Sequence, residues 1–385
     1  MGMPLEGIVV ADFSRVLAGP LATMTLADLG AEVIKVERPG AGDDTRAWGP
    51  PWSADGTSTY FQSVNRTKRS VTLDLRDEAD LLLARELIRR ADVVVENFKP
   101  GTMERLGLDY DTVRQDNPGL VYCSITGFGA AQGAHLLGYD FVVQAVGGLM
   151  SITGDEHPTK AGVALVDVLT GKDATIGILA ALAARARTGM GERLEVALLT
   201  SSLAAMVNQG QAALQGVVPG RMGNQHPSIS PYETLACADA DIAVACGNDV
   251  QFQRMCQVLG LPDLAVDDRF ATNPARVLHR AGLIEALEAR LSTMTAAECV
   301  SLLNSAEVPA GPVNDLPQAI EFADELGLEP TVSMGAEGLR GVRHPVGWTR
   351  YETREPTPPP ALGADDAEVR AWLSTPSSSG ALGSS

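Results

Sequence analysis

The first two hundred residues alternate between short β-type runs and helical stretches, and this order constrains the fold more than any other feature. Strand-like runs fall at residues 8–13, 32–37, 70–75, 93–96 and 121–126, and helical spacing at residues 21–29 and 79–90. A β-α-β-α order of this kind is typical of a parallel sheet with helices on its faces. The sequence therefore predicts an α/β fold.

The second half of the chain changes character. A long helical pattern over about residues 168–187 precedes a strand and a further helix over residues 201–215. Residues 217–231 are rich in Gly, Pro, Ser and Asn, which is typical of a linker. An α-rich segment with a few strands follows, and from about residue 332 the chain returns to short strands and Pro-rich coil.

A length of 385 residues suggests about two domains. The composition changes predict linkers at residues 217–231 and 326–331, a small α+β domain at 232–325, and a disordered Ser/Gly-rich tail at 375–385. Residues 1–216 and 332–374 are left for a larger domain.

The net charge of −18 argues against nucleic acid or an anionic membrane as a partner, although it leaves a phosphorylated ligand possible. The five cysteines show no C-x-x-C pair and no zinc-like spacing, so we interpret them as reduced thiols. The N-terminal residues do not resemble an export signal, and the most apolar helical stretch is too short to span a membrane. These features predict a cytoplasmic protein.

Several common site chemistries lack their motifs. The first strand is followed by FSRVLAGP rather than by G-x-G-x-x-G, which argues against a nicotinamide dehydrogenase. The sequence contains no Walker A motif, no G-x-S-x-G and no H-E-x-x-H, and its five histidines offer little material for a metal site.

Basic residues lie next to loops at the ends of several predicted strands. They are Arg38, Arg66, Lys68, Arg69, Lys99 and Arg105. The carboxyl ends of parallel strands are where open α/β sheets bind ligands, and the helix start at Lys99-Pro100-Gly101 would favour a phosphate. The alternative is that each of these side chains is an ordinary solvated surface charge.

Seven segments, in order, carry a family resemblance. They are LEGIVVADFSRVLAGPLATMTLADLGAEVIKVERPG, NRTKRSVTLDL, VVVENFKPGTMERLGL, SITGFG, GYDFVVQAVGGLMSITG, GVALVDVLTGKDATIGILAAL and VPAGPVNDLPQAI. With them, residues 4 to about 373 resemble the class III CoA-transferases, which include formyl-CoA transferase and carnitine CoA-transferase. The resemblance implies a Rossmann-like large domain formed by both chain ends, a smaller inserted domain, and an interlocked homodimer.

The resemblance also implies a chemistry. An acyl-CoA and a free carboxylic acid are the substrates, and neither a metal nor a prosthetic group is needed. The position matching the family's nucleophile is Asp167, whose carboxylate would form a mixed anhydride and then an aspartyl-CoA thioester. Asp167 lies where an apolar run meets a predicted helix, which would desolvate the carboxylate and place it at a helix N-terminus. From the residues alone, Asp167 could equally be an N-cap.

The family's CoA site maps onto eight positions. They are Val16, Ala18, Arg38, Lys68, Asn97, Phe98, Lys99 and Arg105. Leu17 replaces the glutamine of formyl-CoA transferases, which disfavours formate and oxalate and favours a larger or more apolar acyl group.

Two alternatives to CoA transfer remain. The family's racemases of α-methylacyl-CoA carry Gly-His-Asp where this chain has Gly138-Tyr139-Asp140. A tyrosine with an ordinary pKa near ~10 is a poor proton-transfer group, so Tyr139 suits a transferase as a hydrogen-bonding or shielding residue. Tyr139 could also be a core or interface tyrosine. A CoA-thioester-binding protein without catalysis would require a damaged nucleophile site, and the Asp167 segment is intact.

Overall fold

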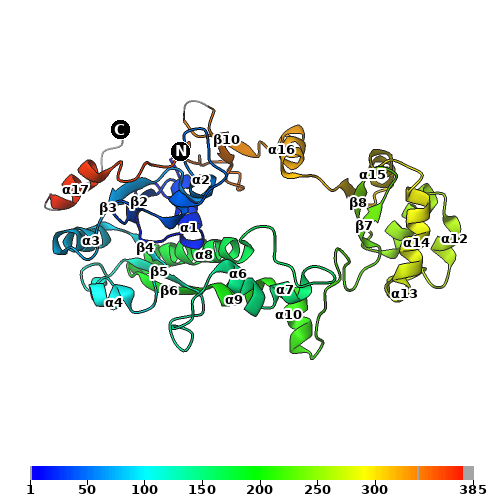
Figure 1. The fold of residues 1–385 in the computed structure, drawn as a ribbon, viewed down its shortest axis with the longest axis horizontal. Coiled ribbons are helices and arrows are strands. Elements are labelled where there is room, and N and C mark those ends of the chain that lie inside the picture. Colours follow the sequence, from blue (N-terminus) through cyan, green and yellow to red (C-terminus); the bar gives the residue numbers. More distant parts are fainter. Residues whose placement is uncertain (1, 336–337, 376–385) are drawn as a thin grey trace. The chain divides into compact units, whose positions relative to one another are not determined.

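The computed structural model describes residues 2–335 and 338–375 (Figure 1). The chain divides into two compact units, a large one of Met1–Leu149, Ala161–Val217 and Glu329–Ser385 and a small one of Met150–Lys160 and Val218–Leu328. Residues 150–160, which the sequence assigned to the large domain, thus group with the small unit. The Gly223 amide, for example, donates to the Gly154 carbonyl oxygen (2.9 Å). Apart from Thr375, the predicted disordered tail lies outside the described residues.

A six-stranded sheet with the order β3-β2-β1-β4-β5-β6 forms the centre of the large unit. Its strands are β1 (Val9–Asp12), β2 (Glu32–Glu37), β3 (Arg69–Thr72), β4 (Val93–Glu96), β5 (Val121–Thr126) and β6 (Glu192–Ala197). Every neighbouring pair is parallel, and Val10 of β1 lies beside Val33 of β2 and Val93 of β4. The predicted α/β class with a parallel sheet is therefore confirmed.

Helices cover both faces of this sheet (Figure 1). Val10, Val33 and Val93 join a core with helices α1 (Ala18–Asp28) and α8 (Leu165–Thr188). The next residue on each strand points to the opposite face and packs against α3 (Glu78–Arg90). Where both faces are buried, as at β1 and β4, the strands read in the sequence as nearly continuous apolar runs.

Shorter elements connect the strands and helices of the large unit. They are η1 (Asp44–Ala47), α2 (Thr59–Asn65), α4 (Thr102–Leu106), α5 (Tyr110–Val113), α6 (Asp140–Val146), α7 (Leu149–Ile152), which crosses into the small unit, α9 (Leu198–Ala205) and α10 (Val207–Leu214).

The C-terminal segment also belongs to the large unit. It forms β10 (Thr331–Ser333), β11 (Arg340–Val342) and α17 (Asp366–Ser374). Helix α17 packs on α3, where the Arg90 guanidinium donates to the Trp372 carbonyl oxygen (2.7 Å). The Thr72 hydroxyl of β3 donates to the Asp366 carboxylate (2.7 Å), which ties the helix to the edge of the sheet.

The small unit combines an antiparallel sheet with helices. Its elements are β7 (Tyr232–Ala236), β8 (Asp241–Ala245), α11 (Asp249–Val258), α12 (Pro262–Val266), α13 (Asn273–Leu278), α14 (Arg280–Leu291), α15 (Ala296–Ser305), β9 (Ala310–Pro312) and α16 (Leu316–Glu325). Its own core includes Phe252, Leu287 and Leu303, all fully buried. Across residues 2–335 and 338–375, no helix combines the length and apolarity needed to cross a membrane.

A buried charge network joins the carboxyl end of β1 to β2, to the loop that follows β2 and to the residue that precedes β3. The Lys68 ammonium donates to the Asp12 carboxylate (3.0 Å), and the Lys35 ammonium pairs with Asp43 (2.9 Å) and donates to the Ser14 carbonyl oxygen (2.9 Å). These four charged side chains are fully buried. Burial alone would raise the pKa of Asp12, but the Lys68 and Lys35 charges outweigh it and lower that pKa to about 2.

Removing one cation from this network should destabilise the large unit. Lys68→Met leaves the buried Asp12 carboxylate without the cation that is ion-paired with it, and we expect a loss of about 3 kcal/mol in the free energy of unfolding. Urea unfolding followed by circular dichroism measures this, with the exposed Arg76→Met, which removes a surface ion pair with Asp74, as the matched control. A Lys68→Met midpoint equal to that of Arg76→Met would contradict the structural role of the network.

Candidate active site

The strand order places a crevice between β1 and β4. In this sheet successive strands are added in one direction from β1 to β3 and in the opposite direction from β4 to β6. In parallel sheets of this kind, ligands bind outside the carboxyl ends of the two strands between which the order reverses. The loop after β1 carries Arg15 and Val16, and the loop after β4 carries Asn97 and Phe98. The Asn97 side chain joins the two loops, because its amide nitrogen donates to the Arg15 carbonyl oxygen (2.7 Å) and its oxygen accepts from the Arg15 amide (2.9 Å).

Val16 adopts a backbone conformation that β-branched residues rarely take. Its φ is 71°, in the left-handed region. The Val16 amide points at the Asp43 carboxylate, 3.3 Å from each oxygen, and Asp43 is held in turn by the buried Lys35. Strain of this kind persists only where the surroundings enforce it, and it is common at functional sites.

A cavity of about 390 Å³ opens at these loops. We call it the Asp167 cavity, and it brings together seven of the predicted site residues: Val16, Ala18, Asn97, Phe98, Lys99, Tyr139 and Asp167. Leu17 also lines it. Among the described residues that line this cavity there is no histidine, and in the described part of the chain no three His, Cys, Asp or Glu side chains gather in a way that could hold a metal ion.

Asp167 lies in the first turn of α8, at the third residue of the helix. The helix begins at Leu165, three residues before the predicted start, and Asp167 is not its N-cap. Instead the buried Asp140 carboxylate of α6 caps the helix from outside, accepting from the amides of Val166 (2.8 Å) and Asp167 (3.3 Å). The Gln144 side chain donates to the other Asp140 oxygen (2.7 Å).

The environment of Asp167 disfavours its charged form. Burial, and then the neighbouring Asp140 charge, raise the pKa of Asp167 to about 7. A carboxyl group with this pKa ionises near neutral pH and is more basic than an ordinary aspartate. It is therefore a stronger nucleophile than a solvated aspartate once it has lost its proton.

Two tyrosines relate to this site in different ways: Tyr139 lines the Asp167 cavity, whereas Tyr60 lines neither cavity and interacts with Asp167 electrostatically. Tyr139 immediately precedes α6 and its side chain is exposed on the Asp167 cavity, which excludes the alternative of a core tyrosine. Burial, followed by the charges of Asp167 and Asp140, raises the pKa of Tyr60 in α2 to about 12, so its hydroxyl stays protonated and can donate a hydrogen bond. Tyr60 could not be singled out from the sequence, because nothing near it in the chain indicates a neighbouring carboxylate.

A second cavity, of about 260 Å³, lies beside the first, and we call it the Arg38 cavity. Arg38 lines it together with Leu73, Leu75 and Arg76, and it shares Arg15 and Phe98 with the Asp167 cavity. The two cavities thus adjoin each other through Arg15 and Phe98.

Two predicted site residues lie outside both cavities. The Lys68 ammonium is fully buried and donates to Asp12, to the Pro20 carbonyl oxygen and to Asn65, so its donors are already occupied. Arg105 is exposed on α4 and lines neither cavity; its guanidinium donates to the Thr102 hydroxyl (3.3 Å). We therefore do not include either residue in the candidate site.

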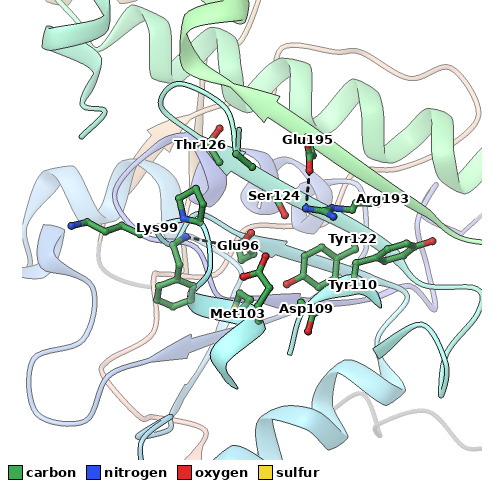
Figure 2. A pocket seen from close by; sticks show the side chains of 14 residues that line it. Glu96, Lys99, Met103, Asp109, Tyr110, Tyr122, Ser124, Thr126, Arg193 and Glu195 are labelled. Atoms are coloured by element: carbon green, nitrogen blue, oxygen red, sulfur yellow. Dashed lines mark hydrogen bonds and ion pairs between the residues drawn. The ribbon is translucent and has the colours of Figure 1, made fainter. Parts of the chain in front are cut away.

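A small acidic cavity also borders the Phe98–Lys99 segment (Figure 2). Its acidic residues are Glu96, Glu104, Asp109 and Glu195. Glu96 accepts from the Phe98 amide (2.9 Å), and burial raises the pKa of Glu96 to about 7. In Figure 2 the Lys99 side chain extends away from the Glu96 carboxyl group. Glu96 thus fixes the backbone of the segment that lines the Asp167 cavity.

The chain matches known proteins over nearly its whole length. Residues 5–366 match the model of CoA-transferase family III. The succinate–glutarate CoA-transferase of Agrobacterium fabrum is 43% identical, covering 97% of this chain and 96% of that protein. The human succinyl-CoA:glutarate CoA-transferase is 41% identical, covering 95% of this chain and 85% of that protein.

A solved structure agrees with these matches. The crystal structure of a CAIB/BAIF family protein from Brucella suis superposes with a TM-score of 0.87 at 42% identity, covering 97% of this chain and 100% of that chain. The resemblance inferred from the sequence is confirmed: the chain belongs to CoA-transferase family III and is a CoA-transferase.

Proposed function

We propose that the protein transfers CoA from an acyl-CoA to a free carboxylic acid through covalent intermediates on Asp167. The observation that carries this proposal is the position of the Asp167 carboxyl group. It lies on a helix N-terminus, inside a cavity formed by the loops after β1 and β4, with its pKa raised to about 7.

The proposed reaction proceeds in balanced steps. An Asp167 oxygen attacks the thioester carbonyl carbon, the carbon–sulfur bond breaks, and CoA leaves as a thiolate. The thiolate then attacks the Asp167 carbonyl carbon, which releases the first carboxylic acid and leaves an aspartyl-CoA thioester. An incoming carboxylate repeats the two steps in reverse. Because a mixed anhydride hydrolyses readily, the cavity must limit access of water, and the proposed role of Tyr139, which lines the cavity, is to shield the anhydride.

CoA is proposed to lie along the two adjoining cavities. Arg38 and the loop residues Asn97, Phe98 and Lys99 would contact its nucleotide and pantetheine, while Val16 and Ala18 would face the thioester. The names of the two glutarate-utilising relatives suggest succinyl-CoA as donor and a short dicarboxylic acid as acceptor. Leu17 in the cavity supports an acyl group larger than formyl.

We also propose a cytoplasmic homodimer. Large apolar side chains are exposed on the neighbouring helices α8, α9 and α10, namely Ile176, Leu203, Val207 and Leu214, and such a surface is typical of an interface. All five cysteines lie in the described ranges and none forms a disulfide, which supports a reducing compartment.

An interlocked dimer should persist in sedimentation experiments at nanomolar concentration, and a readily dissociating monomer would argue against interlocking.

Trapping with hydroxylamine tests the covalent step. Incubation with succinyl-CoA and hydroxylamine should convert the Asp167 side chain to a hydroxamate, detected by mass spectrometry of the peptide that contains it. Asp167→Asn should yield no adduct, whereas Asp173→Asn, an exposed carboxylate on the same helix, should be labelled as in the wild type. A wild-type enzyme that turns over without an adduct would sink the proposal. Scrambling of the α-hydrogen of a branched acyl-CoA would then favour a racemase.

The raised pKa predicts the pH dependence. Only the ionised Asp167 attacks, so kcat/KM for the donor should fall about tenfold per pH unit below about pH 7. Asp140→Asn removes the like charge that helps to raise this pKa while keeping an oxygen that can cap α8. The acid limb of its pH profile should therefore move to lower pH. Asp173→Asn again serves as control, and equal profiles for the two variants would show that Asp140 does not set this pKa.

A further inference from the structure

The Arg15 guanidinium occupies the junction between the Arg38 cavity and the Asp167 cavity. Arg15 and Phe98 line both cavities, and the guanidinium lies 5.5 Å from the centre of the Phe98 ring. The Arg15 Nε is buried and has no hydrogen-bond partner within residues 2–335 and 338–375. A buried donor without an acceptor is costly, so this side chain is arranged for an acceptor that the chain itself does not supply.

A single carboxylate holds Arg15 beside a second arginine. Asp44 lies 3.4 Å from Arg15 through one oxygen and 3.3 Å from Arg38 through the other. All three side chains are about half exposed, so these pairs are weak and open to exchange. Two guanidinium groups that share one carboxylate keep a net positive charge, which suits an oxyanion bearing more than one negative charge.

The place of Arg15 in the fold indicates which oxyanion this is. In a sheet of this order, a dinucleotide places its diphosphate at the loop after β1, close to the N-terminus of the following helix, where glycines let the backbone approach. Here that loop reads FSRVLAGP and lacks the glycine pattern, and it offers the Arg15 guanidinium instead. In CoA the diphosphate likewise lies between the adenosine and the pantetheine.

We propose that Arg15 binds the diphosphate of CoA together with Arg38, taking the place that Asp44 holds in the free protein. The proposal rests on the proposed course of CoA through the two cavities. Arg15 thereby becomes a CoA-binding residue additional to those mapped from the sequence. Asp44 becomes a competitor that keeps the two guanidinium groups in position until CoA arrives.

Calorimetric titration of the full chain with CoA and with 3′-dephospho-CoA tests this. Arg15→Met should weaken both ligands by the same factor, about 10- to 100-fold, because both carry the diphosphate. Arg15→Lys keeps the positive charge, so its affinity for both ligands should fall by a smaller factor than that of Arg15→Met. Asp44→Asn should bind CoA about threefold more tightly, a gain that a purely structural role for Asp44 would not produce. Circular dichroism confirms that each variant is folded.

Substrates that lack one anionic group at a time show which anion Arg15 binds. Arg15→Met should lower kcat/KM for succinyl-CoA but not for succinyl-pantetheine, which lacks the diphosphate. A loss with CoA but not with dephospho-CoA would assign Arg15 to the 3′-phosphate and overturn the proposal. If Arg15→Met lowered kcat/KM equally for succinyl-CoA and succinyl-pantetheine but not for acetyl-CoA, Arg15 would be assigned to the acyl carboxylate. That result would also overturn the proposal. Binding of free CoA needs no covalent step, so failure of hydroxylamine trapping would leave this test intact.

Discussion

The carboxylates of Asp140 and Asp167 both lie at the N-terminus of α8, and the candidate site depends on which of them accepts hydrogen bonds from the first amides of the helix. Asp140 takes the amides of Val166 and Asp167, which would otherwise stabilise a negative charge on the Asp167 side chain. Asp167 is left buried beside a like charge, and its pKa rises to about 7. The helix thus holds Asp167 in place, while the amides of Val166 and Asp167 donate to Asp140 and not to the Asp167 side chain. A carboxylate that is positioned but poorly stabilised is what the proposed attack on a thioester requires.

The loops that face Asp167 are held from below by buried charges. Lys35 pairs with Asp43 and donates to the Ser14 carbonyl oxygen, and Asp43 lies opposite the strained Val16 amide. From the side, the Asn97 amide group fixes the backbone of Arg15. A loop restrained by this many contacts keeps its geometry when ligands enter and leave. Ligand binding therefore does not have to order the loop, and little conformational entropy of the loop is lost on binding.

The sequence predicted most of what local patterns determine. The parallel sheet was predictable because β-type and helical runs alternate along the chain, and because strands covered on both faces, such as β1 and β4, are nearly continuous apolar runs. The position of Asp167 in the site came from the family resemblance, since its local pattern was equally consistent with an N-cap. The start of α8 was predicted three residues late because its cap, Asp140, lies 26 residues before Val166 and leaves no local signal. The burial of Lys68 could not be predicted, because nothing near it in the chain reveals the buried Asp12 with which it pairs. Arg15 and Tyr60 were missed for the same reason: their relevant neighbours are brought close only by the fold.

Oxygen exchange at Asp167 tests the central claim most directly. In the proposed cycle the acceptor carboxylate bonds to Asp167 through one of its own oxygens and leaves that oxygen behind when CoA removes the acyl group. After turnover with succinyl-CoA and an ¹⁸O-labelled dicarboxylic acid, the peptide containing Asp167 should carry ¹⁸O, and mass spectrometry should locate it on that side chain. Turnover that leaves Asp167 unlabelled would mean that CoA passes between the two acids without an aspartyl intermediate, contrary to this account.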